Sequence, residues 1–343
     1  VKTALLPDDF VAPRNNIEWY DLRLALSRAG KIIHITEPLY SLVQMEQAQE
    51  SQFDYVDPRN RDYQIEMEKI CTEHLREIGA LLTVPAEEVD ASEGDFPVEA
   101  SVIIPVRNRV TTVADAVRSA LNQKTIFDFN VIVVDNGSTD GTLEVLQSIS
   151  HPRLHVISVT ESYNTPGIGG CWNRAIFSEL CGRFAVQLDS DDVYSTTETL
   201  QRIIDKFHAE RCAMVVGSYT LTDFDLNIIP PGLIDHREWT PDNGRNNLLR
   251  INGIGAPRAF FTPVARKIMF PDASYGEDYA MALAVSRTYK VGRIFDSLYF
   301  CRRWHDNTDA SLDSSAINRN NYFKDTLRTR ELHARIALNK GRI

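Results

Sequence analysis

The chain has 343 residues, of which 43% are hydrophobic and 24% charged, and its formal net charge is −10. This is the composition of an ordinary globular protein, long enough for one large domain or two modest ones. No cluster of lysine and arginine stands out, which argues against a nucleic acid as the partner, because phosphate binding needs concentrated positive charge.

The first residues give no sign of a targeting or membrane segment. Residues 1–10, "VKTALLPDDF", lack the basic and long apolar regions of a secretory signal, and no stretch approaches the ~20 apolar residues of a spanning helix. Peripheral contact with a membrane stays open. The five cysteines are odd in number and lack CxxC spacing, which predicts reduced thiols in a cytoplasmic protein.

Residues 18–40 and 277–299 repeat one pattern. Aligned without gaps, ten of the 23 positions are identical, whereas chance gives roughly one or two. We interpret residues 1–90 as the closing segment of one domain followed by a connecting helix, and residues 98–343 as the complete version of that domain. Because Val1 falls inside the first copy, an upstream domain is expected to be missing from this chain. The alternative is convergence between two helix–strand units.

A helix and a linker are predicted between the two copies. Apolar residues at roughly helical spacing predict a helix over residues 62–82, so the N-terminal segment reads as helix–strand–helix. Prolines, a glycine and acidic residues then break the pattern over residues 83–100. We place the domain boundary within residues 88–98.

Strands and helices alternate in the second domain. Apolar runs predict strands over 101–106, 129–135, 153–159 and 183–188, and intervening segments predict helices over 110–123, 142–149 and 169–180. Thr111 or Thr112 is expected to cap the first of these helices. The order implies an α/β fold with a mostly parallel sheet and helices on both faces. Ligands bind beyond the carboxyl ends of such strands, where Asp135 and Asp189 fall.

Two familiar ligand-binding loops are excluded by their spacing. A dinucleotide site needs GxGxxG after the first strand, and "PVRNRVTT" lacks it. The segment "DNGSTDGTLEVL" resembles a calcium-binding loop, but the required glycine falls on Asp140 and the closing glutamate on Leu146. Neither site is predicted.

Three aspartates follow the predicted strand over 183–188. Asp189, Asp191 and Asp192 lie within four positions, and crowded carboxylates repel one another unless they are protonated or bind a cation. Oxygen ligands with open positions suit Mg²⁺ or Mn²⁺, which take the rest of their shell from waters and phosphates. The alternative is an exposed acidic turn before the helix that starts near residue 195.

Five segments together resemble the family 2 glycosyltransferases with the GT-A fold. They are "SVIIPVRNR", "VIVVDNGSTDGT", "GIGGCWNRAI", "VQLDSDDVY" and "YGEDYAMAL", in that order, and the resemblance covers about residues 98–310. It implies a cytoplasmic, metal-dependent transferase that uses a nucleotide-sugar, preferably a UDP-sugar, in cell-surface polysaccharide synthesis. The acceptor would be a glycan or a lipid-linked sugar.

The resemblance also implies roles for single residues. Pro105, Arg107, Asp135 and Asn136 would hold the base and ribose, Asp189 the ribose or the metal, and Asp191 the Mg²⁺ or Mn²⁺, with His305 completing the metal shell. Asp278 would be the general base, with Glu277 and Arg258 on the acceptor side. One base without a protein nucleophile predicts a single displacement with inversion. The alternative for Asp278 is an acid favoured by the dipole at a helix N-terminus.

Departures from the family pattern leave other functions open. Asn136 stands where many relatives have a second acid, Trp172 replaces a frequent arginine, and "CRRWH" keeps only part of the motif of polymerising members, which favours single sugar transfer. Trp19 aligns with Asp278, so the first copy lacks the base. A nucleotidyltransferase that makes nucleotide-sugars and a non-catalytic sugar- or nucleotide-binding module are the alternatives.

Overall fold

The computed structural model describes residues 15–33, 35, 37, 60–159, 166–237, 239–304, 307 and 313–341. The chain divides into two compact units. The helical unit comprises Val1–Thr83, Glu238–Ile251 and Leu332–Ile343, and the sheet unit comprises Val84–Arg237 and Asn252–Glu331. The division differs from the predicted domains 1–90 and 98–343, because two later stretches group with the N-terminal residues.

The helical unit contains α1 (Asn16–Ala29), α2 (Arg61–Glu77), the short α7 (Gly244–Asn247) and the end of α10 (Ser314–Asn339). The Asn15 side chain caps α1 by accepting a hydrogen bond from the Glu18 backbone N–H at 3.0 Å. Arg28 then ties α1 to α2 through an ion pair with Glu77 at 2.5 Å. The predicted helix over 62–82 is therefore present as α2, which ends five residues earlier than expected.

The helical half of the N-terminal copy is present as α1, the counterpart of α9 (Glu277–Thr288) in the second copy. The predicted strand after it is not formed at residues 31–33, and residues 34, 36 and 38–40 lie outside the described residues. The two helices also differ in packing, because α1 buries no residue whereas α9 buries seven of its twelve.

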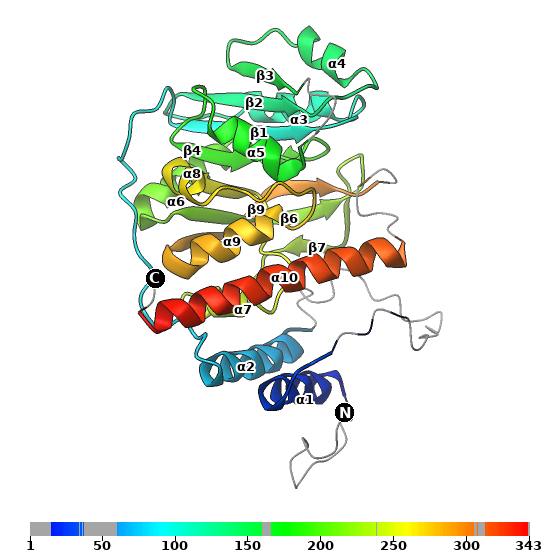
Figure 1. Ribbon diagram of the computed structural model, residues 1–343. Helices are drawn as coiled ribbons and strands as arrows, with labels where there is room; N and C mark the ends of the chain where they lie inside the picture. The colour runs from blue at the N-terminus through cyan, green and yellow to red at the C-terminus, as the bar shows by residue number, and fades with distance from the viewer. Residues whose placement is uncertain are drawn as a thin grey trace. The chain divides into compact units, whose positions relative to one another are not determined.

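Four parallel strands form the first half of the sheet, as predicted. They are β1 (Ala100–Val106), β2 (Phe129–Asp135), β3 (Leu154–Ser158) and β4 (Phe184–Gln187), in the order β3-β2-β1-β4 (Figure 1). Their apolar β-branched residues are almost fully buried in β1 and β2. The register pairs Val106 with Asp135, so β1 and β2 end side by side.

The later strands make the sheet mixed rather than mostly parallel. From β4 the order continues β8 (Arg258–Phe261), β6 (Met214–Thr222), β9 (Val291–Arg302) and β5 (Val193–Tyr194), and β7 (Ile228–Ile234) pairs with β6. The pairings of β8 with β4 and β6 are antiparallel, and β6 with β9 is parallel. The residues at the ends of β4 and β9, which are far apart in the sequence, are therefore brought together in one sheet.

Helices cover this sheet. α3 (Val113–Leu121), α4 (Thr142–Ser148), α5 (Ile168–Ile176), α6 (Thr199–Glu210), α8 (Thr262–Ile268) and α9 complete the sheet unit, and α5, α8 and α9 lie in front of the strands in Figure 1. Thr112 occupies the N-cap of α3 as expected, but its side chain makes no capping bond. Gly169 brings α5 close to the segment before α9, since a Cβ there would lie 1.9 Å from the Pro271 carbonyl oxygen.

The five cysteines are all free thiols, and four of them are buried. Burial raises the pKa of Cys171 and Cys181 to about 11, so both stay protonated at neutral pH. Among the described residues, no helix combines the length and the apolar character needed to cross a membrane.

Candidate functional site

The loops after β1 and β2 are tied together by four hydrogen bonds. The backbone N–H groups of Asn108, Arg109 and Val110 donate to the side chains of Ser138, Thr142 and Asp140, at 2.9, 2.8 and 3.0 Å. In return, the Thr139 N–H donates to the Asn108 side chain at 2.8 Å. Asn108 has a left-handed backbone, with φ of 53°, which asparagine tolerates better than most residues. Polar side chains within residues 135–142 thus fix the conformation of the loop after β1.

Asp135 and Asn136 are buried at the end of β2, next to Val106 of β1. The Asp135 side chain accepts a hydrogen bond from the Ser138 N–H at 3.3 Å, and the Asn136 Nδ2 donates to the Pro166 carbonyl at 2.7 Å. The Asn136 Oδ1 is buried and has no hydrogen-bond partner within the described part of the chain. Pro105 lies in β1 half-buried and Arg107 follows it with an exposed side chain. This edge of the sheet therefore offers a buried hydrogen-bond acceptor.

Asp189 is oriented by two buried residues that the sequence analysis missed. The Gln187 Nε2 donates to both carboxylate oxygens of Asp189, at 2.9 and 3.0 Å. The Asp189 backbone N–H donates to the Tyr299 hydroxyl at 2.9 Å. Burial raises the pKa of Asp189, while the charge of Arg258 and the bond from Gln187 act to lower it. Hydrogen bonds thus fix the orientation of the Asp189 carboxylate, so it is not part of an exposed acidic turn.

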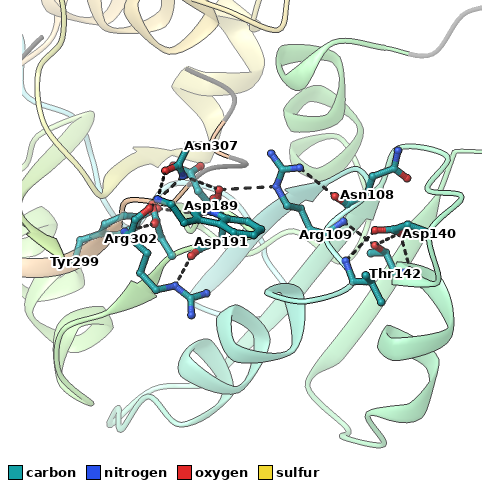
Figure 2. Close-up of polar contacts among 12 residues, drawn as sticks. Asn108, Arg109, Asp140, Thr142, Asp189, Asp191, Tyr299, Arg302 and Asn307 are labelled. Atoms are coloured by element: carbon teal, nitrogen blue, oxygen red, sulfur yellow. Dashed lines mark hydrogen bonds and ion pairs between the residues drawn. The ribbon is translucent and has the colours of Figure 1, made fainter. Parts of the chain in front are cut away.

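Asp191 and Asp192, two and three residues after Asp189, face different surroundings. The Asp191 Oδ2 accepts from Asn307 Nδ2 at 3.2 Å and lies 3.8 Å from the Arg109 Nε (Figure 2). Asp192 is buried, and its Oδ1 accepts from the Arg302 backbone N–H at 2.7 Å. Burial, and then the charges of Asp191 and Asp189, raise the pKa of Asp192 well above its usual range. Asp192 is therefore an anchor, and Asp189 and Asp191 are the candidates for ligand binding.

Arg302 fixes this acidic loop to β9. Its side chain is only 3% exposed, its Nε donates to the Asp191 carbonyl at 2.5 Å, and its Nη1 lies 3.1 Å from Asp115 Oδ2 (Figure 2). The guanidinium also lies 4.8 Å from the Phe224 ring centroid, which is a cation–π distance. Three elements are therefore joined by one cation. Nothing in the sequence around Arg302 indicated these contacts, because Asp191 and Asp115 are over 100 residues away.

Asp278 forms an ion pair with Arg258. The Arg258 Nη1 lies 2.6 Å from Asp278 Oδ2, and Asp278 Oδ1 accepts from the Tyr279 N–H at 2.7 Å. Burial acts to lower the pKa of Arg258, but the charges of Asp278 and Asp189 prevail and raise it. The Arg258 backbone N–H also donates to the Gln187 Oε1 at 3.1 Å. Gln187 and Arg258 therefore connect Asp189 to Asp278 through hydrogen bonds and charge.

Glu277, the other acid of this pair, is buried. Burial and the neighbouring charge of Asp278 raise its pKa to about 8, against opposing contributions from a backbone hydrogen bond and from Arg258. Glu277 is therefore predominantly protonated at pH 7 and can donate a hydrogen bond. The pair "ED" thus supplies one neutral and one charged group.

Stability should decrease as pH rises because of Glu277. The unfolded chain releases this proton near the ordinary glutamate value, about 4.3, whereas the folded chain keeps it until about pH 8. Between these values the folded state binds more protons, so the unfolding free energy falls with pH. We expect Glu277→Gln to flatten this decline in urea unfolding measured at pH 5, 6.5 and 8. An unchanged slope in the variant would show that Glu277 does not titrate in this window.

A hard divalent cation fits the carboxylates of Asp189 and Asp191. Both are oxygen donors next to each other on one loop, and such cations complete their shells with waters and phosphate oxygens. Among the described residues, there is no group of three His, Cys, Asp or Glu side chains that could hold a metal. His305, expected to complete that shell, lies outside the described residues.

The structure groups the predicted site residues into two sets. Asp189, Asp191, Arg258, Glu277 and Asp278 form one, and Pro105, Arg107, Asp135 and Asn136 lie at the ends of β1 and β2. Trp172, which stands where many relatives have an arginine, is a core residue that stacks on Phe270 at a centroid distance of 5.1 Å. α9, the helix that carries Asp278, is buried around most of its circumference.

Comparison with known proteins gives one family and several relatives. Residues 101–268 match the model of "Glycosyl transferase family 2". Chondroitin synthase of Escherichia coli is 37% identical over 136 residues, which are 38% of this chain and 19% of that protein. The glucosyltransferase WfaP of Escherichia coli, a UDP-Glc:alpha-D-GlcNAc-diphosphoundecaprenol beta-1,3-glucosyltransferase, is 28% identical over 186 residues, 54% of this chain and 69% of that protein.

The fold has a solved counterpart. The structure of S. aureus TarS 1-349 in complex with UDP-GlcNAc superimposes with a TM-score of 0.53 at 20% identity, covering 67% of this chain and 66% of that one. The fold is therefore of the GT-A type. The chain spans a fifth or less of the length of the chondroitin and hyaluronan synthases that it matches.

Proposed function

Residues 101–268 belong to glycosyl transferase family 2, and on this basis we propose that the chain transfers a single sugar from a nucleotide-sugar to a hydroxyl group, with inversion. The observation that carries the proposal is the grouping of Asp189 and Asp191 on one loop, with Asp278 linked to them through Arg258 and Gln187. The acceptor is a glycan or a lipid-linked sugar, since one relative is named a chondroitin synthase and another a glucosyltransferase acting on a diphosphoundecaprenol-linked sugar.

Each carboxylate has a distinct task in this proposal. Asp278 accepts the proton of the acceptor hydroxyl as that oxygen attacks the anomeric carbon. A divalent cation held by Asp191, with Asp189, supplies positive charge next to the leaving diphosphate. Arg258 orients Asp278, and Glu277 remains neutral beside it. No protein nucleophile is invoked, so the displacement is single and inverts the configuration.

The nucleobase is proposed to be one that carries a ring N–H, with uracil favoured. The Asn136 Nδ2 is already engaged by the Pro166 carbonyl, so the amide presents its buried Oδ1 as an acceptor. An acceptor pairs with the N3–H of uracil or thymine, or with the N1–H of guanine. Cytosine presents an acceptor at N3 and would leave two acceptors facing each other, which is unfavourable in a buried site.

A thermal-shift panel of nucleotides tests this proposal. We expect UDP with Mn²⁺ to raise the Tm more than UDP alone, and CDP to be at least about tenfold weaker than UDP, because ligands of the folded state stabilise it. Asn136→Leu, which removes the acceptor, should reduce the preference for UDP over CDP. Equal stabilisation by UDP and CDP in the wild type would contradict the role of Asn136. No stabilisation by any nucleotide diphosphate would contradict the proposed function.

We further propose that residues 18–33 derive from the closing segment of a second GT-A-like unit. The repeat itself and the helix α1 at its expected place support this. Trp19 stands at the position of Asp278 and is 56% exposed, so this copy carries no base there. The segment would then act in assembly rather than in catalysis.

A further inference from the structure

The helix α10 packs on the turn that carries Asp278. Residues 314–331 of this helix belong to the sheet unit, as α9 does. Gly276, the N-cap of α9, has a left-handed backbone with φ of 75°, and a Cβ there would lie 3.5 Å from the Phe323 ring and 3.7 Å from the Leu327 side chain. These are van der Waals distances, so α10 lies against the backbone two residues before Asp278.

Lys324 of α10 places a buried ammonium group between two segments of the chain. Its Nζ donates to the Asn252 carbonyl at 2.6 Å, and it lies 4.7 Å from the Tyr275 ring centroid and 5.5 Å from that of Tyr279. These contacts are a charge-assisted hydrogen bond and two cation–π interactions. Lys324 is only 8% exposed. Its side chain therefore joins the loop that begins at Asn252 to the turn that leads into α9.

Arg328, one turn further along α10, joins the same two segments. Its Nη2 donates to the Asn252 Oδ1 at 2.8 Å, and its Nε donates to the Tyr279 hydroxyl at 3.2 Å. Asn252 is thus held through its main chain by Lys324 and through its side chain by Arg328.

The two joined segments carry the ion pair of Arg258 with Asp278. The loop from Asn252 leads to Arg258, and the Gly255 carbonyl in this loop accepts a hydrogen bond from the Arg258 Nη1 at 3.2 Å. The same nitrogen lies 2.6 Å from the Asp278 carboxylate. The turn at Tyr275 lies three residues before Asp278. A shift of either segment would therefore change how the carboxylate of Asp278 is oriented.

We propose that Lys324 is a positioning residue for sugar transfer, which holds Asp278 and Arg258 in one arrangement from α10. The inference rests on the proposed function, because it takes Asp278 to be the base. Burying an ammonium group is costly, and an apolar residue would fill the same space without that cost. An apolar residue makes no directional bond, however, whereas the lysine fixes a carbonyl and two rings at once. Because Lys324 is buried, it acts through these groups and not on the substrate.

Turnover and donor binding together separate positioning from general support of the fold. We expect Lys324→Met to lower kcat by about 10- to 100-fold, because a base misplaced by about 1 Å loses rate on this scale. KM for the donor and the affinity for UDP should change by less than about threefold, since the residues proposed to bind the donor lie on other elements. Turnover is measured as UDP released from UDP-glucose or UDP-GlcNAc with water as the acceptor, and affinity by calorimetry.

Three further variants define what the cation contributes. Lys324→Arg keeps the charge and the donors, and it should recover most of the lost turnover. Tyr275→Leu removes one ring that faces the ammonium group, at a residue that is 37% exposed, and should give a smaller loss without unfolding the protein. Arg319→Met removes an exposed cation of α10 that binds Ser315, and this matched control should change neither turnover nor affinity.

Hydrogen exchange tests the link made by Lys324 independently of turnover. In Lys324→Met, the backbone amides of residues 252–258 and 275–280 should exchange at least about tenfold faster, while those of β1 and β2 stay unchanged. Wild-type exchange in both segments, or a wild-type kcat, would show that Lys324 does not position the base.

Two other results would reduce Lys324 to a packing residue. One is a loss of UDP affinity as large as the loss of kcat, and the other is a Lys324→Arg variant no more active than Lys324→Met. A wild type that releases no UDP from either donor would instead contradict the proposed sugar transfer, and hydrogen exchange would still decide whether Lys324 links the two segments.

Discussion

Asp191→Asn is expected to remove the Mn²⁺-dependent part of UDP binding and to lower turnover by roughly 10²–10⁴-fold. The amide keeps the shape of the side chain but loses the negative charge that a hard cation requires. A bound cation contributes several kcal/mol at a developing charge, and each 1.36 kcal/mol is a factor of ten in rate. UDP binding without Mn²⁺ should be affected far less, so titrations in the presence and absence of the metal give the decisive comparison.

The fold should survive this substitution. Arg302 binds the backbone carbonyl of Asp191 and not its carboxylate, and the buried anchor of the loop is the side chain of Asp192. The Asp191 carboxylate lies 3.8 Å from the Arg109 Nε, a longer ion pair than the 2.6 Å one between Asp278 and Arg258, so Asp191→Asn should lower the Tm by less than Asp278→Asn. Asp192→Ala should lower the Tm, because it removes the buried acceptor of the Arg302 backbone N–H. Asp296→Asn, an exposed acid that pairs with Arg202, is the matched control and should change neither property. Equal Mn²⁺-linked stabilisation in the wild type and in Asp191→Asn would exclude Asp191 from the metal site.

The parallel half of the sheet could be predicted because its signals are local. β1 and β2 are runs of Val and Ile bounded by polar turns, and strands of this kind carry their burial pattern in consecutive residues. The ends of β2 and β4 then located Asp135 and Asp189. The antiparallel strand β8 was not predicted, because its four residues, "RAFF", carry no periodic pattern of their own and are placed by partners on both sides.

The supporting residues of the site could not be predicted, for a related reason. Gln187, Tyr299 and Arg302 act through partners that are distant in sequence or that depend on a side-chain orientation. Tyr299 is 110 residues from Asp189, and the pairing of β9 with β5 and β6 brings it there. The ion pair of Arg258 with Asp278 could likewise not be predicted, although the sequence analysis named each of the two residues as a site candidate. Sequence motifs named the candidate residues, and the mixed half of the sheet supplies their orientation.

The other large effect is expected at Asp278. Asp278→Asn should reduce turnover by roughly 10²–10⁴-fold and leave the affinity for UDP within a few-fold of wild type, because the amide cannot accept the acceptor's proton and makes little difference to donor binding. The structure adds a second consequence. The substitution removes the partner of Arg258, whose guanidinium lies 2.6 Å from the carboxylate and is only 17% exposed. Removing one member of a largely buried ion pair destabilises the fold, so the Tm should fall as well.

The double variant Arg258→Met/Asp278→Asn separates catalysis from stability. In Asp278→Asn the Arg258 guanidinium is left without its carboxylate partner, whereas methionine at position 258 carries no charge. The double variant should therefore regain much of the Tm lost in Asp278→Asn. Turnover should not recover, because the base is still missing. Arg258→Met alone keeps the base but frees it from its ion pair, and its loss of turnover should be smaller than that of Asp278→Asn. If the double variant recovers turnover together with stability, Asp278 is a structural partner of Arg258 and the base is elsewhere. If Asp278→Asn loses UDP binding and turnover in equal measure, the carboxylate belongs to the donor site.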